Sequence, residues 1–493
     1  MALVGDGVGA AVLLDALSVG AAAPPGRITV VGPGVRRWRG LAFGADAVAS
    51  LTNIGAAAMS VRPGDPGHYL RWAEATGTAG TAFPHRAVFG RYLEHTAGEA
   101  AARLRRRGCR VDVLTGRVTR VRRTPDGVDT RWEPLPGTAG AAVRRLESAA
   151  AVLCCGASEP ADPYGLARSD GRVLAPYPLE ELVAAVPPGA RVAVAGTGLT
   201  AVDVACALAD AGRCREITLV SRRGLLPSVR PAGPPHPVRH FTLDRIRTEG
   251  GLGGLLALLG AELAAEGLSF ADLRVEWGGS ESAADRLRRQ LDDGGTAARA
   301  LRVLRHAVGG TGAEAAGLLG LADRRRLDGR TGRKLRSLLF PMPAHTAVRV
   351  RELFDREVLR VVAGRIERGG GRGGAAFRVL PDAPGVGAVR EADLVVNAVL
   401  RPSDEHLTEA EGVPPDSREG PVARMVREGH ARAHPLGGVE ADPLTGLLTG
   451  ADGAGAPVHA LGTLTQGVNA FACGLPWLAR HSTRIAAALS APG

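Results

Sequence analysis

The sequence has almost no lysine and few aromatic residues, and both shortages argue against a nucleic-acid partner. Lys334 is the only lysine, so the net charge of +11 is carried by arginine in a chain that is also rich in glycine and alanine. This charge reflects a general compositional bias more than a binding face. Aromatic residues make up only 4% of the chain, and no basic run alternates with them. The stacking surface that single-stranded nucleic acid requires is therefore missing.

Cysteines and long apolar runs are also scarce. The six cysteines include no Cys-x-x-Cys pair, and His, Cys and Asp nowhere show the spacing of metal ligands. We therefore expect no disulfide framework and no metal, and a reducing, cytoplasmic location. Apolar runs are shorter than the roughly 18 to 20 residues that span a bilayer. The apolar N-terminus lacks a basic region and contains Asp6 and Asp15, so we expect a soluble chain without a signal peptide or a membrane partner.

A dinucleotide-binding fingerprint occupies the N-terminus of this 493-residue chain, which is long enough for two or three domains. Leu3-Val4 predicts a buried strand, and residues 11–17 predict a helix. The turn between them supplies the predicted contacts Gly5, Gly7, Gly9 and Ala10. The glycines permit the turn and let a pyrophosphate approach the backbone at the helix N-terminus.

Two features of this first fingerprint predict weak dinucleotide binding. The strand expected over residues 27–31 is followed by Gly32, where an acid normally binds the ribose hydroxyls. Asp6 adds a carboxylate inside the turn, close to the expected pyrophosphate. Alternatively, Arg36 or Arg37 supplies another ribose contact and makes the site receptive to a phosphorylated ribose.

A second and cleaner fingerprint lies far downstream. Residues 191–195 predict a strand, 202–211 a helix and 217–220 the next strand. This last strand ends in arginines, whose planar forks pair with phosphate oxygens, and the site is therefore predicted to bind the 2′-phosphate of NADPH. The predicted contacts are Gly196, Thr197, Gly198, Thr200, Ser221, Arg222 and Arg223.

Further segments match a known family in order and spacing. They are residues 39–44, 51–54, 65–72, 83–86, 89–93, 221–227, 393–397 and 461–465. The chain resembles bacterial FAD/NAD(P)-binding proteins that are distant relatives of the N-hydroxylating class B flavin monooxygenases. This resemblance covers most of the chain except roughly residues 231–340, where Leu, Ala and Arg recur at helical spacing, with breaks expected at Gly294-Gly295 and Gly309-Gly310.

The resemblance implies an α/β fold with two Rossmann-like dinucleotide-binding domains and a helical insertion. The FAD domain is discontinuous, and the NADPH domain is inserted into it. We expect residues 1–165 and 386–493 to form the FAD domain, residues 166–230 and 344–385 the NADPH domain, and residues 231–343 the helical insertion.

The resemblance also implies further cofactor contacts, which are Arg39, Asn53, Gly156, Gly462, Thr463, Asn469 and Ala470. A last helix, near residues 477–489, is expected to direct its N-terminus at a flavin carbonyl. For Asn469 a helix cap is an equally good interpretation. Cys154-Cys155 stands where the family has Ala-Thr, and we interpret these cysteines as buried packing residues.

No acid–base residue is assigned, but Asn53, His85, Arg86 and His345 are candidates. His345 and Arg349 lie four apart on a predicted helix, where they either converge on an anionic substrate or form a structural pair. The resemblance implies that NADPH reduces FAD and that a C4a-hydroperoxide then uses molecular oxygen to N-hydroxylate a small amine or amino acid. The alternatives are a flavin oxidoreductase without oxygen insertion and a flavin-free NADP(H)-binding protein.

Overall fold

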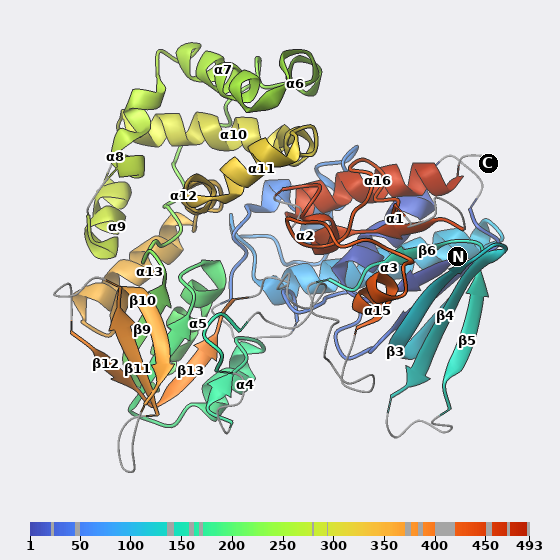
Figure 1. The fold of residues 1–493 in the computed structure, drawn as a ribbon, viewed down its shortest axis with the longest axis horizontal. Helices are drawn as coiled ribbons and strands as arrows, with labels where there is room; N and C mark the ends of the chain where they lie inside the picture. Colours follow the sequence, from blue (N-terminus) through green and yellow to red (C-terminus); the bar gives the residue numbers. More distant parts are fainter. Residues whose placement is uncertain are drawn as a thin grey trace. The chain divides into compact units, whose positions relative to one another are not determined.

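The computed structural model describes most of the chain: residues 1–20, 24–44, 50–135, 142–156, 162–166, 171–278, 281–292, 294–369, 376–382, 388–399, 420–449, 456–470 and 474–490. The chain divides into two compact units. The first unit consists of Met1–Asp46, Ile54–Glu159 and Arg401–Gly493, and the second of Ala47–Asn53 and Pro160–Leu400. Figure 1 labels most of the helices and several strands of both.

The first unit is built on a sheet whose strand order is β14-β6-β1-β2-β3-β4-β5. The strands are β1 (Ala2–Val4), β2 (Arg27–Gly32), β3 (Arg110–Thr124), β4 (Gly127–Pro134), β5 (Arg144–Ser148), β6 (Ala151–Leu153) and β14 (Val458–Ala460). In this order, the neighbouring strands from β14 through β6, β1 and β2 to β3 are parallel. Strand β4 pairs antiparallel with β3, and β5 pairs antiparallel with β4. The central strands β1 and β6 are buried along their whole length, as expected where helices or loops cover both faces of a parallel sheet.

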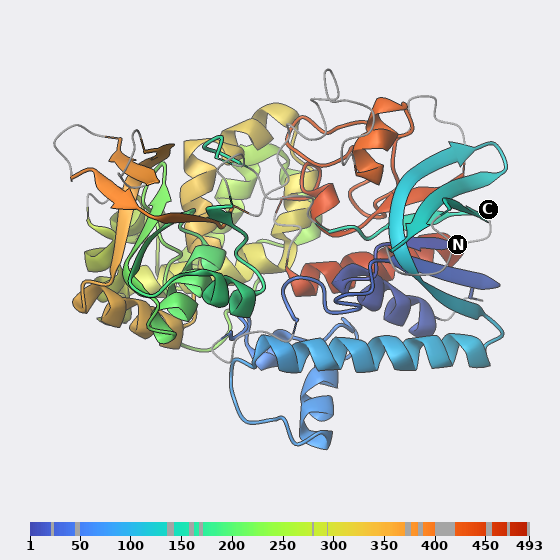
Figure 2. The same ribbon diagram turned by 90° about the horizontal axis from the view of Figure 1, so that it is seen from below.

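The helices of this unit are α1 (Val8–Val19), α2 (His68–Ala75), α3 (Arg86–Arg106), α15 (Pro421–Arg427) and α16 (Leu475–Ser490), with short 3₁₀ turns η1 (Ala56–Ala58) and η3 (Gly462–Thr465). Helix α2 packs against α3, where Tyr69 meets Tyr92. Figure 2 shows α3 as the long light-blue helix. One core joins Leu13 of α1, Ile28 of β2, Leu104 of α3 and Ile485 of α16, so α1 is enclosed on several sides.

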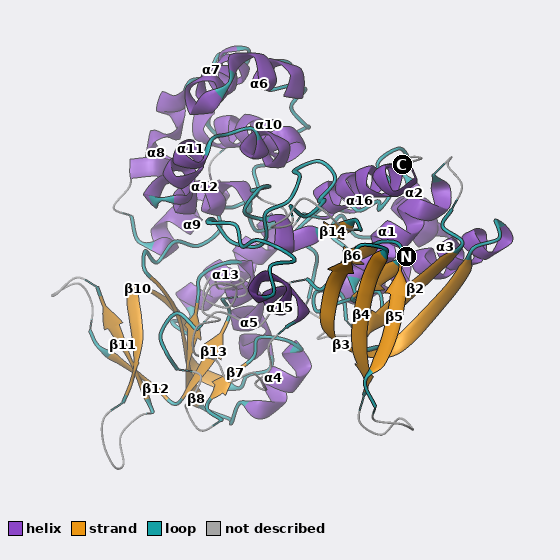
Figure 3. Cartoon of the chain, turned by 45° about the vertical axis from the view of Figure 1, so that its right-hand side comes forward, coloured by secondary structure: helices purple, strands orange, loops and turns teal. Residues whose placement is uncertain are grey.

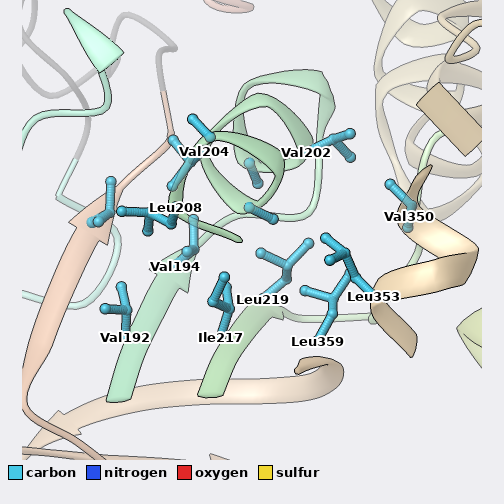
Figure 4. Close-up of a cluster of buried hydrophobic side chains, with 14 of the residues drawn as sticks. Val192, Val194, Val202, Val204, Leu208, Ile217, Leu219, Val350, Leu353 and Leu359 are labelled. Atoms are coloured by element: carbon cyan, nitrogen blue, oxygen red, sulfur yellow. The ribbon is translucent and has the colours of Figure 1, made fainter. Parts of the chain in front are cut away.

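The second unit has a sheet in the order β12-β11-β10-β9-β8-β13-β7. Its strands are β7 (Val173–Leu174), β8 (Ala190–Ala195), β9 (Cys214–Ser221), β10 (Leu359–Arg368), β11 (Phe377–Pro381), β12 (Arg390–Ala392) and β13 (Leu394–Asn397). The helices α4 (Leu179–Ala185), α5 (Leu199–Asp210) and α13 (Ala344–Asp355) accompany it. In Figure 4, Val194 and Leu219 of the sheet meet Leu208 of α5 and Leu353 of α13 in one buried cluster.

A group of helices interrupts the second unit between β9 and β10. Figure 3 labels them α6 to α12. They are α6 (Leu243–Glu249), α7 (Gly251–Ala264), η2 (Phe270–Leu273), α8 (Arg274–Gly278), α9 (Ala283–Asp292), α10 (Thr296–Gly317), α11 (Leu321–Asp328) and α12 (Arg330–Leu339). The 22-residue helix α10 contributes Leu301 and Leu304 to one core and Ala307 and Ala315 to another. These cores hold the other helices around it.

The predicted fold class is confirmed, with two details corrected. The break expected at Gly309-Gly310 is wrong, because both glycines lie inside α10. Each costs about 1 kcal/mol relative to alanine in a helix, but the two cores hold α10 on both sides of the pair. The boundary expected at residue 386 also differs, because β12 and β13 belong to the second sheet, where β13 pairs with β8. A buried four-residue strand does not reveal which of two parallel sheets it joins.

Candidate dinucleotide-binding sites

The two glycine fingerprints form equivalent turns. Gly5 and Gly196 have φ angles of 105° and 115°, which residues with a side chain rarely adopt. The Gly5 N–H donates to the Val31 carbonyl at 2.8 Å, and the Gly196 N–H donates to the Val220 carbonyl at 2.7 Å. Each first glycine therefore ties its turn to the neighbouring parallel strand, as the fingerprint predicts.

Close packing also explains why position 5 is glycine. A Cβ atom on Gly5 would lie 2.6 Å from the Cys154 carbonyl oxygen, at the end of β6. In the second unit, the Cβ position of Gly196 lies 3.5 Å from the Ala398 carbonyl oxygen, just beyond β13. The segments that directly follow β6 and β13 thus occupy equivalent places beside the two turns.

The helix N-termini that follow these turns can hold anions. Helix α1 follows Gly7 and α5 follows Gly198, and neither helix has a side-chain cap or an acidic residue in its first turn. The first N–H groups of a helix lack intrahelical partners and carry a partial positive charge. A Cβ atom on Gly198 would have no neighbour within 4 Å. At Gly7 the corresponding Cβ position lies 3.6 Å from Gly40 Cα. The second turn is therefore open to a dinucleotide pyrophosphate, while the first is approached by the backbone of Gly40.

The adenosine end of the second site carries no acid. Thr197 Oγ1 lies 3.0 Å from Ser221 Oγ and donates to the Leu225 carbonyl at 2.7 Å. These contacts hold the turn against the end of β9. Arg222 is exposed, and among the described residues it makes no hydrogen bond or ion pair, so its guanidinium is available to a phosphate.

The adenosine end of the first site differs from the sequence expectation. Asp6 is 5% exposed, and its Oδ2 accepts a hydrogen bond from the Gly34 N–H at 2.8 Å. Its carboxylate therefore lies at the end of β2, beside Gly32 and Gly34, instead of pointing along the phosphate-binding turn. Arg37 Nε is 3.6 Å from the same Oδ2. The Asp6 carboxylate is thus held at the end of β2 by a backbone N–H and beside a guanidinium.

Buried polar atoms mark the C-terminal part of the first unit. Gly462 has a φ angle of 80° and begins η3. Asn469 is fully buried, and its Nδ2 donates to the Pro443 carbonyl at 3.0 Å. Among the described residues, Asn469 Oδ1 and Thr463 Oγ1 have no hydrogen-bond partner, which suits a polar ligand. Because α16 begins at Leu475, Asn469 is not its N-cap, and the cap interpretation is wrong.

The adjacent cysteines are not placed for thiol chemistry. The described cysteines are free, and Cys154 is buried in the core beside α1. Burial raises the pKa of the Cys154 thiol well above its usual range and the pKa of Cys155 to about 12. Although Cys155 is exposed as a residue, its sulfur faces the Val4 carbonyl oxygen at 3.5 Å. Thiols of such high pKa are protonated and poor nucleophiles at neutral pH.

The four catalytic candidates fall into different units. His85 directly precedes α3, and Arg86, its first residue, is 8% exposed. Both belong to the first unit, whereas Asn53 and His345 belong to the second. The Asn53 carbonyl accepts a hydrogen bond from Arg230. Neither unit by itself brings all four candidates together.

The other predicted cofactor contacts, Arg39, Gly156 and Thr200, lie in different local environments. Arg39 makes a two-pronged ion pair with Glu94 of α3, with both distances 2.6 Å. Gly156 has a φ angle of 71° and no atom within 4 Å of its Cβ position. Thr200 lies in the first turn of α5.

His345 and Arg349 lie on one face of α13 and line a cavity of about 160 Å³. Across it, α5 contributes Asp203, Cys206 and Asp210. Arg349 pairs with Asp210 and, at 3.1 Å, with Glu352, so its charge is already compensated. Burial lowers the pKa of His345. These contacts favour the structural interpretation of the pair.

The carboxylates of this cavity were missed by sequence reasoning. Asp203 Oδ2 accepts a hydrogen bond from the Tyr177 hydroxyl at 2.6 Å. The two residues belong to segments 26 positions apart, and no local pattern joins them. Nowhere in the described ranges, this cavity included, is a group of three His, Cys, Asp or Glu side chains placed to hold a metal ion. No described helix has both the length and the apolar character needed to cross a membrane.

Comparison with known proteins agrees with this geometry. Residues 2–158 match the model of a family described as FAD-NAD(P)-binding. None of the curated proteins compared by sequence matches the chain. Among solved structures, ornithine hydroxylase from Pseudomonas aeruginosa has a TM-score of 0.61 at 14% identity, covering 99% of this chain and 98% of that one.

Two further solved structures share the fold over nearly the whole length. Ornithine N-hydroxylase from Kutzneria sp. 744 has a TM-score of 0.55 at 16% identity and covers 99% of this chain and 98% of that one. The FAD-bound cadaverine monooxygenase from Erwinia amylovora has a TM-score of 0.53 at 12% identity, with coverage of 98% and 92%. The chain therefore has the fold of flavoproteins with two dinucleotide-binding domains, and the family match over residues 2–158 agrees with the predicted cofactors, FAD and NADPH.

Proposed function

We propose that the protein is an NADPH-dependent flavin monooxygenase that hydroxylates the nitrogen of a small amine or amino acid. The observation that supports it most directly is a fold shared over 98–99% of this chain with three amine- or ornithine-oxidising enzymes. The two glycine turns, each followed by an uncapped helix, fit two dinucleotides in one chain. A flavin partnered by a nicotinamide is the cofactor set that such a reaction requires.

The residues of this chain have distinct roles in the proposal. Gly5, Gly7 and the N-terminus of α1 hold the FAD pyrophosphate, and Gly198 and the N-terminus of α5 hold that of NADPH. Arg222 pairs with the 2′-phosphate. Thr463 and Asn469 bring unpaired buried oxygens to the flavin region. The bound flavin supplies the electron transfer and oxygen chemistry, while these residues bind and orient the cofactors.

The proposed reaction balances with one oxygen molecule. NADPH gives two electrons as hydride, and a proton is taken from solvent. One oxygen atom enters the new N–OH bond, replacing an N–H hydrogen, and the other leaves as water. The products are a hydroxylamine, NADP⁺ and water in equal amounts.

The first experiment is an absorbance spectrum of the purified protein, with added FAD if needed, before and after anaerobic NADPH. We expect a flavin band that bleaches. NADPH and oxygen consumption is then measured with ornithine, lysine and cadaverine, and the products are identified by mass. A product heavier by one oxygen atom, with little peroxide, supports the proposal.

Other outcomes separate the alternatives. Flavin reduction with peroxide as the only oxygen product, for every amine tested, favours an oxidoreductase without oxygen insertion. Absence of flavin binding even with added FAD favours the flavin-free NADP(H)-binding protein.

A further inference from the structure

The first dinucleotide site lacks an acid on β2 but has a carboxylate in the same space. A Cβ atom built on Gly32 would lie 2.3 Å from Asp6 Cγ and 2.4 Å from Asp6 Oδ1. Real Cβ atoms essentially never approach other atoms so closely. The Asp6 side chain therefore fills the volume in which a side chain on residue 32 would begin. An acid at position 6 and an acid at position 32 exclude each other.

The strand register explains why residue 6 reaches this place. Strands β1 and β2 are parallel neighbours, with Val4 opposite Val31. Asp6 is two residues beyond Val4, and Gly32 is one residue beyond Val31. Both therefore lie at the carboxyl edge of the sheet, where doubly wound folds bind their ligands. Because positions 6 and 32 lie beside each other at the ends of adjacent strands, a carboxylate can be placed at this edge of the sheet from either position.

The contacts of Asp6 leave part of the carboxylate available. Oδ2 accepts from the Gly34 N–H and is 3.6 Å from Arg37 Nε. Arg37 is held in turn by a hydrogen bond from its Nη2 to Thr115 Oγ1, at 2.6 Å. Among the described residues, Oδ1 accepts no hydrogen bond. An ionised carboxylate has about four acceptor positions, so Asp6 retains capacity for ribose hydroxyl donors.

We propose that Asp6 is the ribose-binding carboxylate of the first site and replaces the acid that normally ends β2. The ligand is an adenosine ribose with both hydroxyls free, as in FAD. The carboxylate also repels a 2′-phosphate, so the first site selects against NADPH. Arg37 is already engaged by Asp6 and Thr115 and does not recruit a phosphorylated ribose. This inference rests on the proposed binding of FAD by the first unit, but not on the hydroxylation reaction.

The test measures the dissociation constant of FAD for flavin-free protein by the quenching of flavin fluorescence. Asp6→Asn keeps the size of the side chain and removes its charge. We expect it to weaken FAD binding about tenfold or more, because charge-assisted hydrogen bonds are lost. The matched control is Asp112→Asn, which breaks a surface ion pair with Arg27 (2.7 Å) on the same sheet and should leave FAD affinity unchanged.

An exchange of the two residues tests the position directly. Asp6→Gly should weaken FAD binding, and the double variant Asp6→Gly/Gly32→Asp should restore most of the loss. Gly32→Asp alone should lower the thermal unfolding midpoint, because two carboxylates then compete for one space. Restoration by the double variant is the result that a general packing role of Asp6 does not produce.

Competition separates recognition of the ribose from a role in folding. ADP-ribose should displace FAD from the wild-type protein more effectively than 2′-phospho-ADP-ribose, and this preference should shrink in Asp6→Asn. The proposal is overturned if Asp6→Asn lowers only the unfolding midpoint while FAD affinity and the ribose preference stay as in the wild type. It is also overturned if the wild type binds neither FAD nor ADP-ribose. If ADP-ribose binds with the expected preference but no amine is hydroxylated, the assignment of Asp6 stands and only the proposed reaction fails.

Discussion

The carboxylate of Glu262 lies 2.9 Å from Nε2 of His236, and both side chains are buried within the helical insertion. The other carboxylate oxygen of Glu262 accepts hydrogen bonds from the backbone N–H groups of Arg239, His240 and Phe241, at 2.7 and 2.8 Å for the first and last. One side chain of α7 thus fixes the loop that leads into α6.

Replacing this carboxylate should destabilise the protein. Glu262→Ala leaves several buried donors without an acceptor, and we expect a loss of about 3–5 kcal/mol in the free energy of unfolding. Urea denaturation followed by circular dichroism measures it. The control Asp244→Asn, which changes an exposed carboxylate on α6, should change stability by less than about 0.5 kcal/mol. Equal effects of the two substitutions would contradict a structural role for Glu262.

The same carboxylate predicts an acid dependence of stability. Burial raises the pKa of Glu262, but hydrogen bonds from His236 and the three backbone N–H groups outweigh it and lower the pKa to about 2. In the unfolded chain the pKa of Glu is about 4.3. The stabilisation is therefore present above about pH 4.3 and is lost as the pH falls toward 2. Unfolding measured from pH 5 to 2 should show a shallower decline in Glu262→Gln than in the wild type.

Arg222 should discriminate between the nicotinamide cofactors. Arg222→Ala removes the exposed guanidinium at the end of β9, and we expect NADPH binding to weaken about 10- to 100-fold with little change for NADH. Anaerobic flavin reduction at varied cofactor concentration measures both. Arg365→Ala, a loss of an exposed arginine on β10 that pairs with Glu367, should change neither. Similar losses with NADPH and NADH would refute the 2′-phosphate assignment.

Gly198 should affect binding without affecting folding. A Cβ atom at this position has no protein neighbour within 4 Å, and its φ angle of −78° suits any residue. Gly198→Val should therefore retain the wild-type unfolding midpoint yet weaken NADPH strongly, because its side chain occupies the expected pyrophosphate position. Gly5→Ala provides the contrast. Its Cβ atom would lie 2.6 Å from a carbonyl oxygen, so this substitution should lower the unfolding midpoint. Unchanged NADPH affinity in Gly198→Val would show that the pyrophosphate binds elsewhere.

The adjacent cysteines should be dispensable for electron transfer. The variant Cys154→Ala/Cys155→Ser should reduce its flavin with NADPH at a rate within about twofold of the wild type, because thiols of such high pKa do not act as a redox pair at neutral pH. Stopped-flow absorbance at the flavin band measures the rate. Ellman's reagent should also react more slowly with the native than with the denatured wild-type protein at pH 8. A large loss of reduction rate in the variant would contradict this assignment and indicate that the two thiols take part in electron transfer.

The sequence by itself determined the two strand–turn–helix units and the charge that follows the second one. Gly5 and Gly196 need a positive φ, and Arg222 follows the end of β9. These features depend on residues within about 30 positions of each other, so spacing and residue type are sufficient to identify them. The helical character of the insertion followed from the same kind of local periodicity.

Only the tertiary structure decided how Asp6 relates to Gly32, which sheet receives β13, and that Gly309 and Gly310 lie within a continuous α10. It also brought His345 and Arg349 against the carboxylates of α5. In each case the outcome depends on contacts between segments distant in the sequence, where packing and charge pairing override local preference. Gly32 predicted weak dinucleotide binding from the sequence because the carboxylate that we propose replaces the acid follows the neighbouring strand β1.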